Sequence, residues 1–290
     1  MKNVIEIKDL KKYYGSARGV EKANLTLQEG EILGFVGPNG AGKSTVIRLL
    51  VGLITKTSGE IKIFGEKPCS KVNKEIGYLP SEVFMYPELT VVKQLKYYSE
   101  IRNCGMEKAL ELAEKLDLDL NKKIRDLSFG NRKKVGIIAA LMHNPKIIIL
   151  DEPTTGLDPL IQQKFLMLLE DAKRSGSSII LSSHILSEVE KICDRVALIK
   201  DGVVLFTSPI KELKTSLYRK VIIAPVDLKI NIEGLNYINN ENNESIYAYR
   251  GDINKLIKGL SNYELHSLKI NELGLEEIFM HYYQKGDKND

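Results

Sequence analysis

Hydrophobic residues follow two different periods along this chain of 290 residues. Period-two alternation and short apolar runs predict strands, whereas spacings of three and four predict helices. Strand patterns dominate the first 80 residues, residues 86–142 have helical spacing, and short strands and helices alternate from residue 146 onward. The predicted strands of this part are 4–7, 25–27, 32–36, 60–64, 76–79, 147–150, 178–181 and 196–199. The predicted helices outside 86–142 are 46–51, 160–173 and 187–192.

The amino-acid composition changes after about residue 215. Asparagine and glutamate fill residues 239–244, which predicts a polar loop. The elements predicted around it are strands 221–224, 246–249 and 265–270 and helices 253–260 and 275–283. We therefore predict a small α+β appendix at 216–290 that follows a larger domain at 1–215.

Strands that alternate with helices favour a mostly parallel sheet with helices on its faces. The predicted fold class is therefore α/β, with an N-terminal antiparallel β portion. The helical stretch at about 82–142 interrupts the alternation, and we predict that it forms an inserted helical subdomain.

Composition narrows the class of protein. Apolar residues make up 43% and charged residues 28%, which is typical of a globular chain. The net charge of +4 is too small to indicate nucleic-acid binding. No apolar run approaches a membrane span, and the N-terminus lacks the pattern of a signal peptide. The three cysteines are far apart and predict neither disulfides nor a metal site. We expect a soluble cytoplasmic protein, which can still dock on a membrane protein.

A phosphate-binding loop is the strongest motif. Residues 37–44 read GPNGAGKS, which fits G-x-x-x-x-G-K-[ST] between a predicted strand and a predicted helix. In such a loop successive backbone N–H groups and the helix N-terminus surround an anion, and the lysine reaches the β- and γ-phosphates. The serine hydroxyl can bind Mg²⁺. The predicted nucleotide-binding residues are Gly37, Asn39, Gly40, Ala41, Gly42, Lys43, Ser44 and Thr45.

Two carboxylates follow a second apolar strand. The run 147–150 ends in Asp151 and Glu152. Asp151 can join Ser44 at Mg²⁺, and Glu152 can polarise the attacking water. Kinases, GTPases and ATPases share the phosphate loop, but a glutamate directed at water favours hydrolysis over transfer to a substrate hydroxyl.

The order of several further motifs carries a family resemblance. After the phosphate loop come LSFGN at 127–131, Asp-Glu-Pro at 151–153, Gly-Leu-Asp at 156–158 and a histidine at 184. Over about residues 3–215 the chain resembles the nucleotide-binding subunit of ABC transporters. The appendix and the closing LGLEEIFMHYY resemble the C-terminal extension of the ABC-2 exporter group.

The resemblance implies roles for five more residues. Tyr14 matches the aromatic residue that stacks on adenine. Ser128 and Gly130 match the signature that covers the γ-phosphate held by the other subunit. Asp158 matches a loop that contacts the partner's site, and His184 matches the histidine that contacts the γ-phosphate. Each has a structural alternative as well: a partly buried strand-end tyrosine, N-cap residues before two helices, and a structural histidine.

The chain departs from the family pattern at two places. Ser81 stands where the family has a glutamine that ligates Mg²⁺ and senses the membrane partner, and Glu82 follows it. We predict that Ser81 faces the metal and Glu82 faces the permease; the reverse, or no metal contact at all, also fits the sequence. The signature reads Phe129 and Asn131 in place of glycine and glutamine.

The resemblance implies an ATP- and Mg²⁺-dependent ATPase that drives a separate integral membrane permease, with export favoured. Two copies, or one copy and a paralogue, would close head to tail on two ATP molecules. The subunit would lie on the cytoplasmic face of the membrane, bound through the permease, and we expect no nucleic-acid partner. The alternatives are a soluble ABC-type ATPase that acts on ribosomes or DNA and a P-loop kinase or GTPase. A single cassette without long coiled coils argues against the first, and the LSFG element without Asn-Lys-x-Asp argues against the second.

Overall fold

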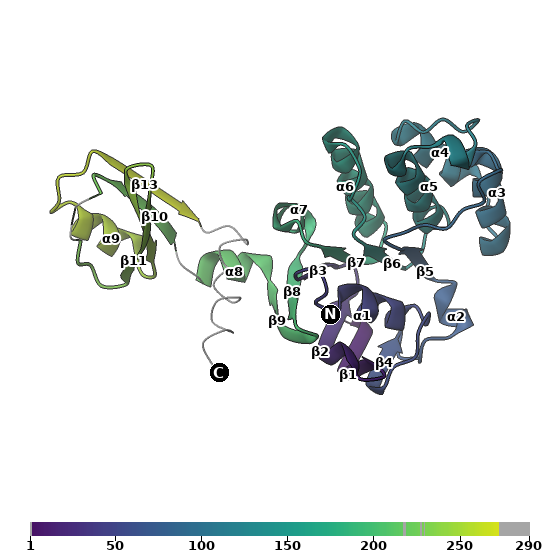
Figure 1. Cartoon of the computed structure of the whole chain (residues 1–290), viewed down its shortest axis with the longest axis horizontal. Helices are drawn as coiled ribbons and strands as arrows, with labels where there is room; N and C mark the ends of the chain where they lie inside the picture. Colours follow the sequence, from purple (N-terminus) through teal and green to yellow (C-terminus); the bar gives the residue numbers. More distant parts are fainter. Residues whose placement is uncertain (1, 217–218, 227, 229, 273–290) are drawn as a thin grey trace. The chain divides into compact units, whose positions relative to one another are not determined.

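The computed structural model describes residues 2–216, 219–226, 228 and 230–272. The chain divides into two compact units, Met1–Pro209 and Ile210–Asp290 (Figure 1). The predicted helix at 275–283 lies outside the described residues. Within the described ranges, no helix has both the length and the apolar character that crossing a membrane requires.

A nine-stranded sheet organises the first unit. Its spatial order is β4-β1-β2-β9-β8-β3-β7-β6-β5. The run from β8 to β5 is parallel, whereas β1 pairs antiparallel with β2 and β4, and β8 with β9. The predicted parallel core and N-terminal antiparallel portion are both present. The strands are β1 (Asn3–Tyr14), β2 (Ala17–Gln28), β3 (Ile32–Val36), β4 (Ser58–Ile63), β5 (Ile76–Leu79), β6 (Ile147–Asp151), β7 (Ser178–Ser183), β8 (Arg195–Lys200) and β9 (Val203–Pro209).

Helices cover both faces of the parallel strands. Figure 1 shows α1 on one face and α5, α6 and α7 on the other. Strands β3 and β6 are consequently buried along their whole length, which explains their unbroken apolar runs. The helices of this unit are α1 (Lys43–Leu50), α2 (Ser70–Asn73), α3 (Val91–Arg102), α4 (Glu107–Lys115), the short 3₁₀ turn η1 (Ile124–Asp126), α5 (Phe129–Leu141), α6 (Pro159–Arg174) and α7 (Leu186–Ile192).

The helical insertion is a cluster in which α3 and α4 both pack on α5. Residues 80–90 before it are not helical, so the helical spacing read from residue 86 begins a few residues too early. Helix α5 also packs on β5. This contact joins the insertion to the edge of the sheet next to β6.

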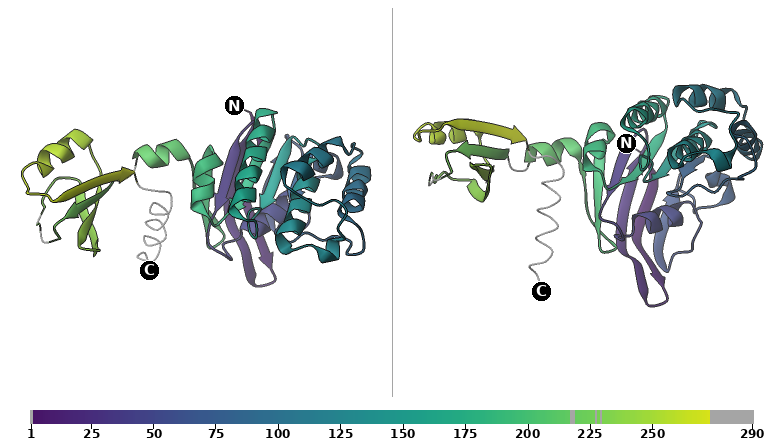
Figure 2. Two further views of the ribbon diagram at one scale, coloured as in Figure 1. Left: turned by 90° about the horizontal axis from the view of Figure 1, so that it is seen from above. Right: turned by 45° about the horizontal axis from the view of Figure 1, so that its top comes forward.

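The second unit is a small antiparallel sheet with one helix on its face (Figure 2). Its strand order is β11-β12-β10-β13. Val221 and Tyr247 of the sheet share a core with Leu256 and Leu260 of α9. The elements of this unit are α8 (Ile210–Ser216), β10 (Arg219–Ala224), β11 (Leu235–Glu241), β12 (Glu244–Tyr249), α9 (Ile253–Leu260) and β13 (Ser267–Glu272).

The prediction of a polar loop at 239–244 was wrong in part. Residues 239–241 are the end of β11, paired with β12, and only Asn242 and Asn243 make the turn. Both have positive φ, 49° and 66°, which matches the tight hairpin turns that asparagine favours. Strand β11 lies at the sheet edge and has exposed polar side chains, so its sequence lacks an apolar alternation.

Candidate functional site

The residues predicted to bind phosphate, metal and the attacking water lie at the carboxyl ends of neighbouring parallel strands. The phosphate loop follows β3, Ser81 follows β5, Asp151 ends β6 and His184 follows β7. Strands β3, β7, β6 and β5 are consecutive in the sheet. Because the carboxyl ends of parallel strands meet at one edge, residues separated by more than 100 positions converge there.

The phosphate loop depends on glycine where it enters α1. Gly42, the N-cap residue, has a φ of +105°, and a Cβ atom there would lie 2.7 Å from the carbonyl oxygen of Gly19. A side chain at this position is therefore excluded both by the backbone conformation and by space. The tight turn places the free N–H groups of the helix start around the loop, where an anion binds favourably.

Lys43 lies within the loop and is only 6% exposed. Its ammonium donates hydrogen bonds to the carbonyl oxygens of Gly37, at 2.7 Å, and Pro38, at 3.2 Å. It also lies 3.4 Å from Oε1 of Glu152. The cation is thus held between the loop and the acidic pair, within reach of a phosphate bound in the loop.

A buried serine organises the acidic pair. The Ser182 hydroxyl donates to Oδ1 of Asp151 at 2.7 Å and accepts the backbone N–H of Glu152 at 3.0 Å. Glu152 has a φ of 48°, a conformation that costs energy for a residue with a side chain and recurs at functional sites. Sequence analysis missed Ser182, although a polar pair at the end of the apolar strand β7 is a usable signal.

His184 contacts the catalytic candidate directly. Its Nδ1 lies 2.7 Å from Oε2 of Glu152, and its side chain is 48% exposed. The other oxygen of the same carboxylate is the one near Lys43. One carboxylate therefore lies between an imidazole and an ammonium, which fixes its orientation.

The site has a carboxylate oxygen available to a metal ion. Oδ2 of Asp151 is buried with no hydrogen-bond partner among the described residues; Oε1 of Glu152 also lacks a hydrogen bond there but pairs with Lys43. Carboxylate and hydroxyl oxygens suit Mg²⁺, which usually also takes waters and substrate phosphates. The described ranges contain no group of three or more His, Cys, Asp or Glu that could hold a metal ion. The residues present therefore fit Mg²⁺, and Ser44 and Asp151 are the residues that would hold it.

Ser81 and Glu82 differ in exposure. Ser81 is half-buried and Glu82 is exposed. The carbonyl oxygens of Pro80 and Ser81 accept hydrogen bonds from Nζ of Lys133, at 3.4 and 3.2 Å. Contact of the Ser81 hydroxyl with a metal stays a prediction.

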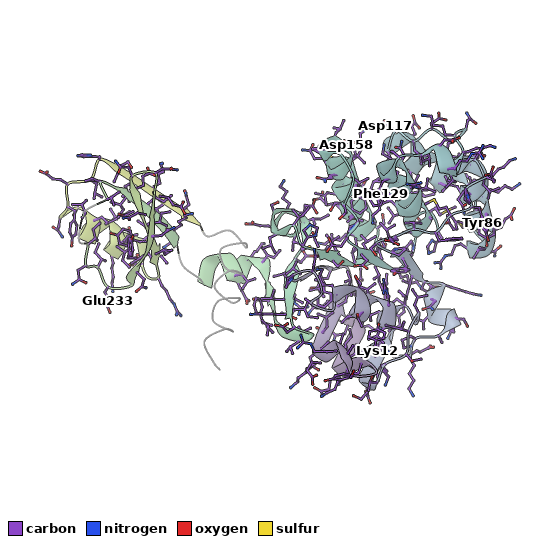
Figure 3. The ribbon with its side chains drawn as sticks, viewed as in Figure 1. Lys12, Tyr86, Asp117, Phe129, Asp158 and Glu233 are labelled. Atoms are coloured by element: carbon purple, nitrogen blue, oxygen red, sulfur yellow. The ribbon has the colours of Figure 1, made fainter. Side chains whose placement is uncertain are left out.

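Tyr14 lies at the end of β1, 46% exposed. A Cβ atom on Gly19 would lie 2.9 Å from its ring, and Gly19 in turn touches Gly42 of the phosphate loop. The ammonium of Lys12, labelled in Figure 3, lies 4.8 Å from the ring centroid. A half-exposed ring beside the phosphate loop is suited to stacking on a nucleotide base.

Ser128 and Asp158 are both N-cap residues, which is the structural role that the sequence offered as an alternative. The Ser128 hydroxyl accepts the N–H of Asn131 at 3.3 Å, and the Asp158 carboxylate accepts the N–H of Ile161 at 3.0 Å. Both side chains are exposed at helix starts, as is Phe129, labelled with Asp158 in Figure 3. The caps leave both residues accessible to a partner.

Gly130 has a packing role within its own chain. A Cβ atom on it would lie 2.6 Å from the carbonyl oxygen of Gly156. The start of α5 and the Gly-Leu-Asp turn therefore touch through their backbones, which only a glycine at position 130 allows.

Two more buried charges near the site escaped sequence analysis. Glu188 on α7 accepts a hydrogen bond from the Thr154 hydroxyl at 2.8 Å, and its burial raises its pKa above the ordinary value. Lys133 on α5 is 2% exposed, and burial lowers its pKa to about 8. Neither belongs to a motif, and only the packing of distant elements brings them to the site.

Comparisons with known proteins agree with this geometry. The family model described as ABC transporter matches residues 20–155. The bacitracin transport ATP-binding protein BcrA of Bacillus licheniformis is 32% identical over the whole chain and 89% of its own length. The lantibiotic transport ATP-binding protein SrtF of Streptococcus pyogenes is 35% identical over 70% of this chain and 89% of its own.

Solved structures show the same likeness. The ATP-binding subunit of an ABC transporter superposes with a TM-score of 0.68 at 29% identity, covering 73% of this chain and 92% of the other. A dimeric bacterial ABC transporter cassette gives a TM-score of 0.66 at 27% identity over 71% and 98% of the two chains. The same cassette is also known in a post-hydrolysis state bound to ADP and Pi, with a TM-score of 0.63. With its phosphate loop, acidic pair and full-length relative, this chain belongs to the ABC transporter family as an ATP-binding, ATP-hydrolysing subunit.

Proposed function

We propose that this subunit powers export through a separate membrane permease. The observation that carries the ATPase assignment is the single carboxylate of Glu152, held between His184 at 2.7 Å and Lys43 at 3.4 Å. Export is supported by the resemblance of the appendix to the ABC-2 group. It is also supported by relatives named for the transport of bacitracin and lantibiotics.

The residues divide the chemistry among them. The loop N–H groups and Lys43 bind the β- and γ-phosphates. To do so, the Lys43 ammonium gives up its hydrogen bonds to the carbonyl oxygens of Gly37 and Pro38 and donates to the phosphates instead. Glu152 accepts a hydrogen bond from the attacking water and aligns it, and His184 keeps the carboxylate oriented toward it. Bound Mg²⁺ supplies charge neutralisation at the phosphate oxygens.

The proposal includes a second subunit, identical or related. Ser128, Gly130 and Asp158 would complete the partner's nucleotide site, and the exposure of both caps supports this role. We further propose residues 1–215 as the ATP-binding domain and 216–290 as the appendix. The protein would lie at the cytoplasmic face of the membrane through its permease.

Two variants test the proposal. Glu152→Gln keeps the shape of the side chain but removes its charge, so hydrolysis should fall by at least about a hundredfold while ATP is retained and a dimer accumulates. Lys43→Ala should lose nucleotide binding itself and stay monomeric. Light scattering with and without ATP–Mg²⁺ reports the dimer, and phosphate release reports turnover. Near wild-type turnover in Glu152→Gln would contradict the assignment.

A further inference from the structure

Lys133 is a buried cation at the junction between the helical insertion and the sheet. It belongs to α5, and its side chain is 2% exposed. Its ammonium donates to the carbonyl oxygens of Pro80 and Ser81, at 3.4 and 3.2 Å. These carbonyls form the turn directly after β5, where Ser81 replaces the family's glutamine.

The ammonium also lies on the side of the sheet edge that carries the acidic pair, because the turn that it binds follows Leu79 of β5, which pairs with Leu150 of β6 directly before Asp151. Asp151 and Glu152 favour its charged form, which partly offsets the effect of burial on its pKa. Each of these carboxylates has one buried oxygen without a hydrogen-bond partner in the described ranges. A buried charge is tolerated only where opposite charge or hydrogen bonds compensate it. Lys133 finds both, from the turn on one side and from the carboxylates on the other.

We propose that Lys133 is a positioning residue for ATP hydrolysis, which fixes the Ser81 turn beside the acidic pair and weakens the attraction of that pair for Mg²⁺. The inference rests on the proposed function of the site. Its first part follows from the two hydrogen bonds. Its second part follows because a positive charge beside the acidic pair repels a cation that approaches Asp151.

Three variants separate this role from general packing. Lys133→Met keeps the approximate length of the side chain but removes charge and donors. Lys133→Gln removes the charge and keeps an N–H donor on a shorter side chain, and Lys133→Arg keeps both charge and donors. Lys134→Met is the control, because Lys134 is also buried on α5 but acts electrostatically on Asp117. Melting curves first establish that each variant folds. If Lys133→Met does not fold, Lys133→Gln replaces it as the neutral variant.

Two readouts do not depend on turnover. The first is the Mg²⁺ concentration needed for ADP–Mg²⁺ binding, measured by calorimetry; it should fall by about threefold or more in Lys133→Met and Lys133→Gln. The second is amide hydrogen exchange over residues 81–83, which should quicken by about tenfold in Lys133→Met. In ATPase assays kcat should fall in Lys133→Met with KM for ATP unchanged, and Lys133→Arg should restore it.

Unchanged Mg²⁺ dependence and unchanged exchange in the neutral Lys133 variants would overturn the inference, as would equal shifts in Lys134→Met. These outcomes differ from failure of the proposed function. In that case the wild-type chain itself would not hydrolyse ATP, or Glu152→Gln would hydrolyse it normally.

Discussion

Ser182→Ala tests whether the acidic pair is held from β7. The hydroxyl makes two contacts, one to the carboxylate of Asp151 and one to the backbone N–H of Glu152. Ser182 is fully buried. The substitution removes one oxygen and leaves the backbone of β7 unchanged.

The expected cost follows from the two groups left behind. A hydrogen bond to a charged group contributes about 1.5–3 kcal/mol, and a buried N–H without a partner costs about 1–3 kcal/mol. Allowing for partial relaxation, the free energy of unfolding should fall by about 2–4 kcal/mol. For a unit of this size that lowers the melting temperature by about 5–15 °C. Because Glu152 loses its backbone anchor, kcat should also fall by about tenfold to a hundredfold.

Differential scanning calorimetry and a phosphate-release assay measure the two effects. Ser183→Ala is the matched control, since the neighbouring hydroxyl is also buried but bonds to the backbone of Ile185, accepting its N–H at 2.9 Å and donating to its carbonyl oxygen at 3.5 Å. It should cost about 1 kcal/mol and leave kcat within about twofold of wild type. If Ser182→Ala melts and turns over like Ser183→Ala, the serine does not organise the acidic pair.

Two further predictions concern other parts of the first unit. Tyr14→Ala should weaken ATP binding by about 1–3 kcal/mol, the value of a base–aromatic stack, and Tyr14→Phe should restore it in nucleotide titrations; equal loss in both variants would refute stacking. His143 has its pKa lowered from 6.5 to about 4 by burial, so the unfolded chain takes up a proton that the folded chain does not. The free energy of unfolding should therefore fall as the pH drops from about 6.5 to 4, and urea titrations of His143→Gln should show a shallower fall.

The parts of the fold that could be predicted from the sequence are those with strong local periodicity. The apolar runs of β3 and β6 are buried on both faces, and the phosphate loop between β3 and α1 has a motif of its own. Edge strands are different. Strand β9 is only partly buried, and β11 reads LNYINNE with Tyr237 and Ile238 exposed, so neither has the period-two alternation that predicts a strand.

The same division applies to the site. Glu152 and Lys43 belong to motifs whose chemistry is local, so their identity could be predicted. Ser182, Lys133 and Glu188 act across elements: their partners lie on other strands and turns, 30 to 52 residues away. No spacing along the chain encodes such a contact, because the order of strands in the sheet decides it.

The order of strands in the sheet also affects how the protein folds during its synthesis. Strand β3, which precedes the phosphate loop, pairs on its two sides with β7 and β8. Residues 32–36 leave the ribosome early, but their second neighbour is complete only at Lys200. Until nearly the whole first unit has been synthesised, an apolar strand has an open edge and the nucleotide loop has no finished support. Nascent chains of this subunit therefore depend on late, long-range pairing, which makes slow folding and chaperone protection during translation the expected consequence.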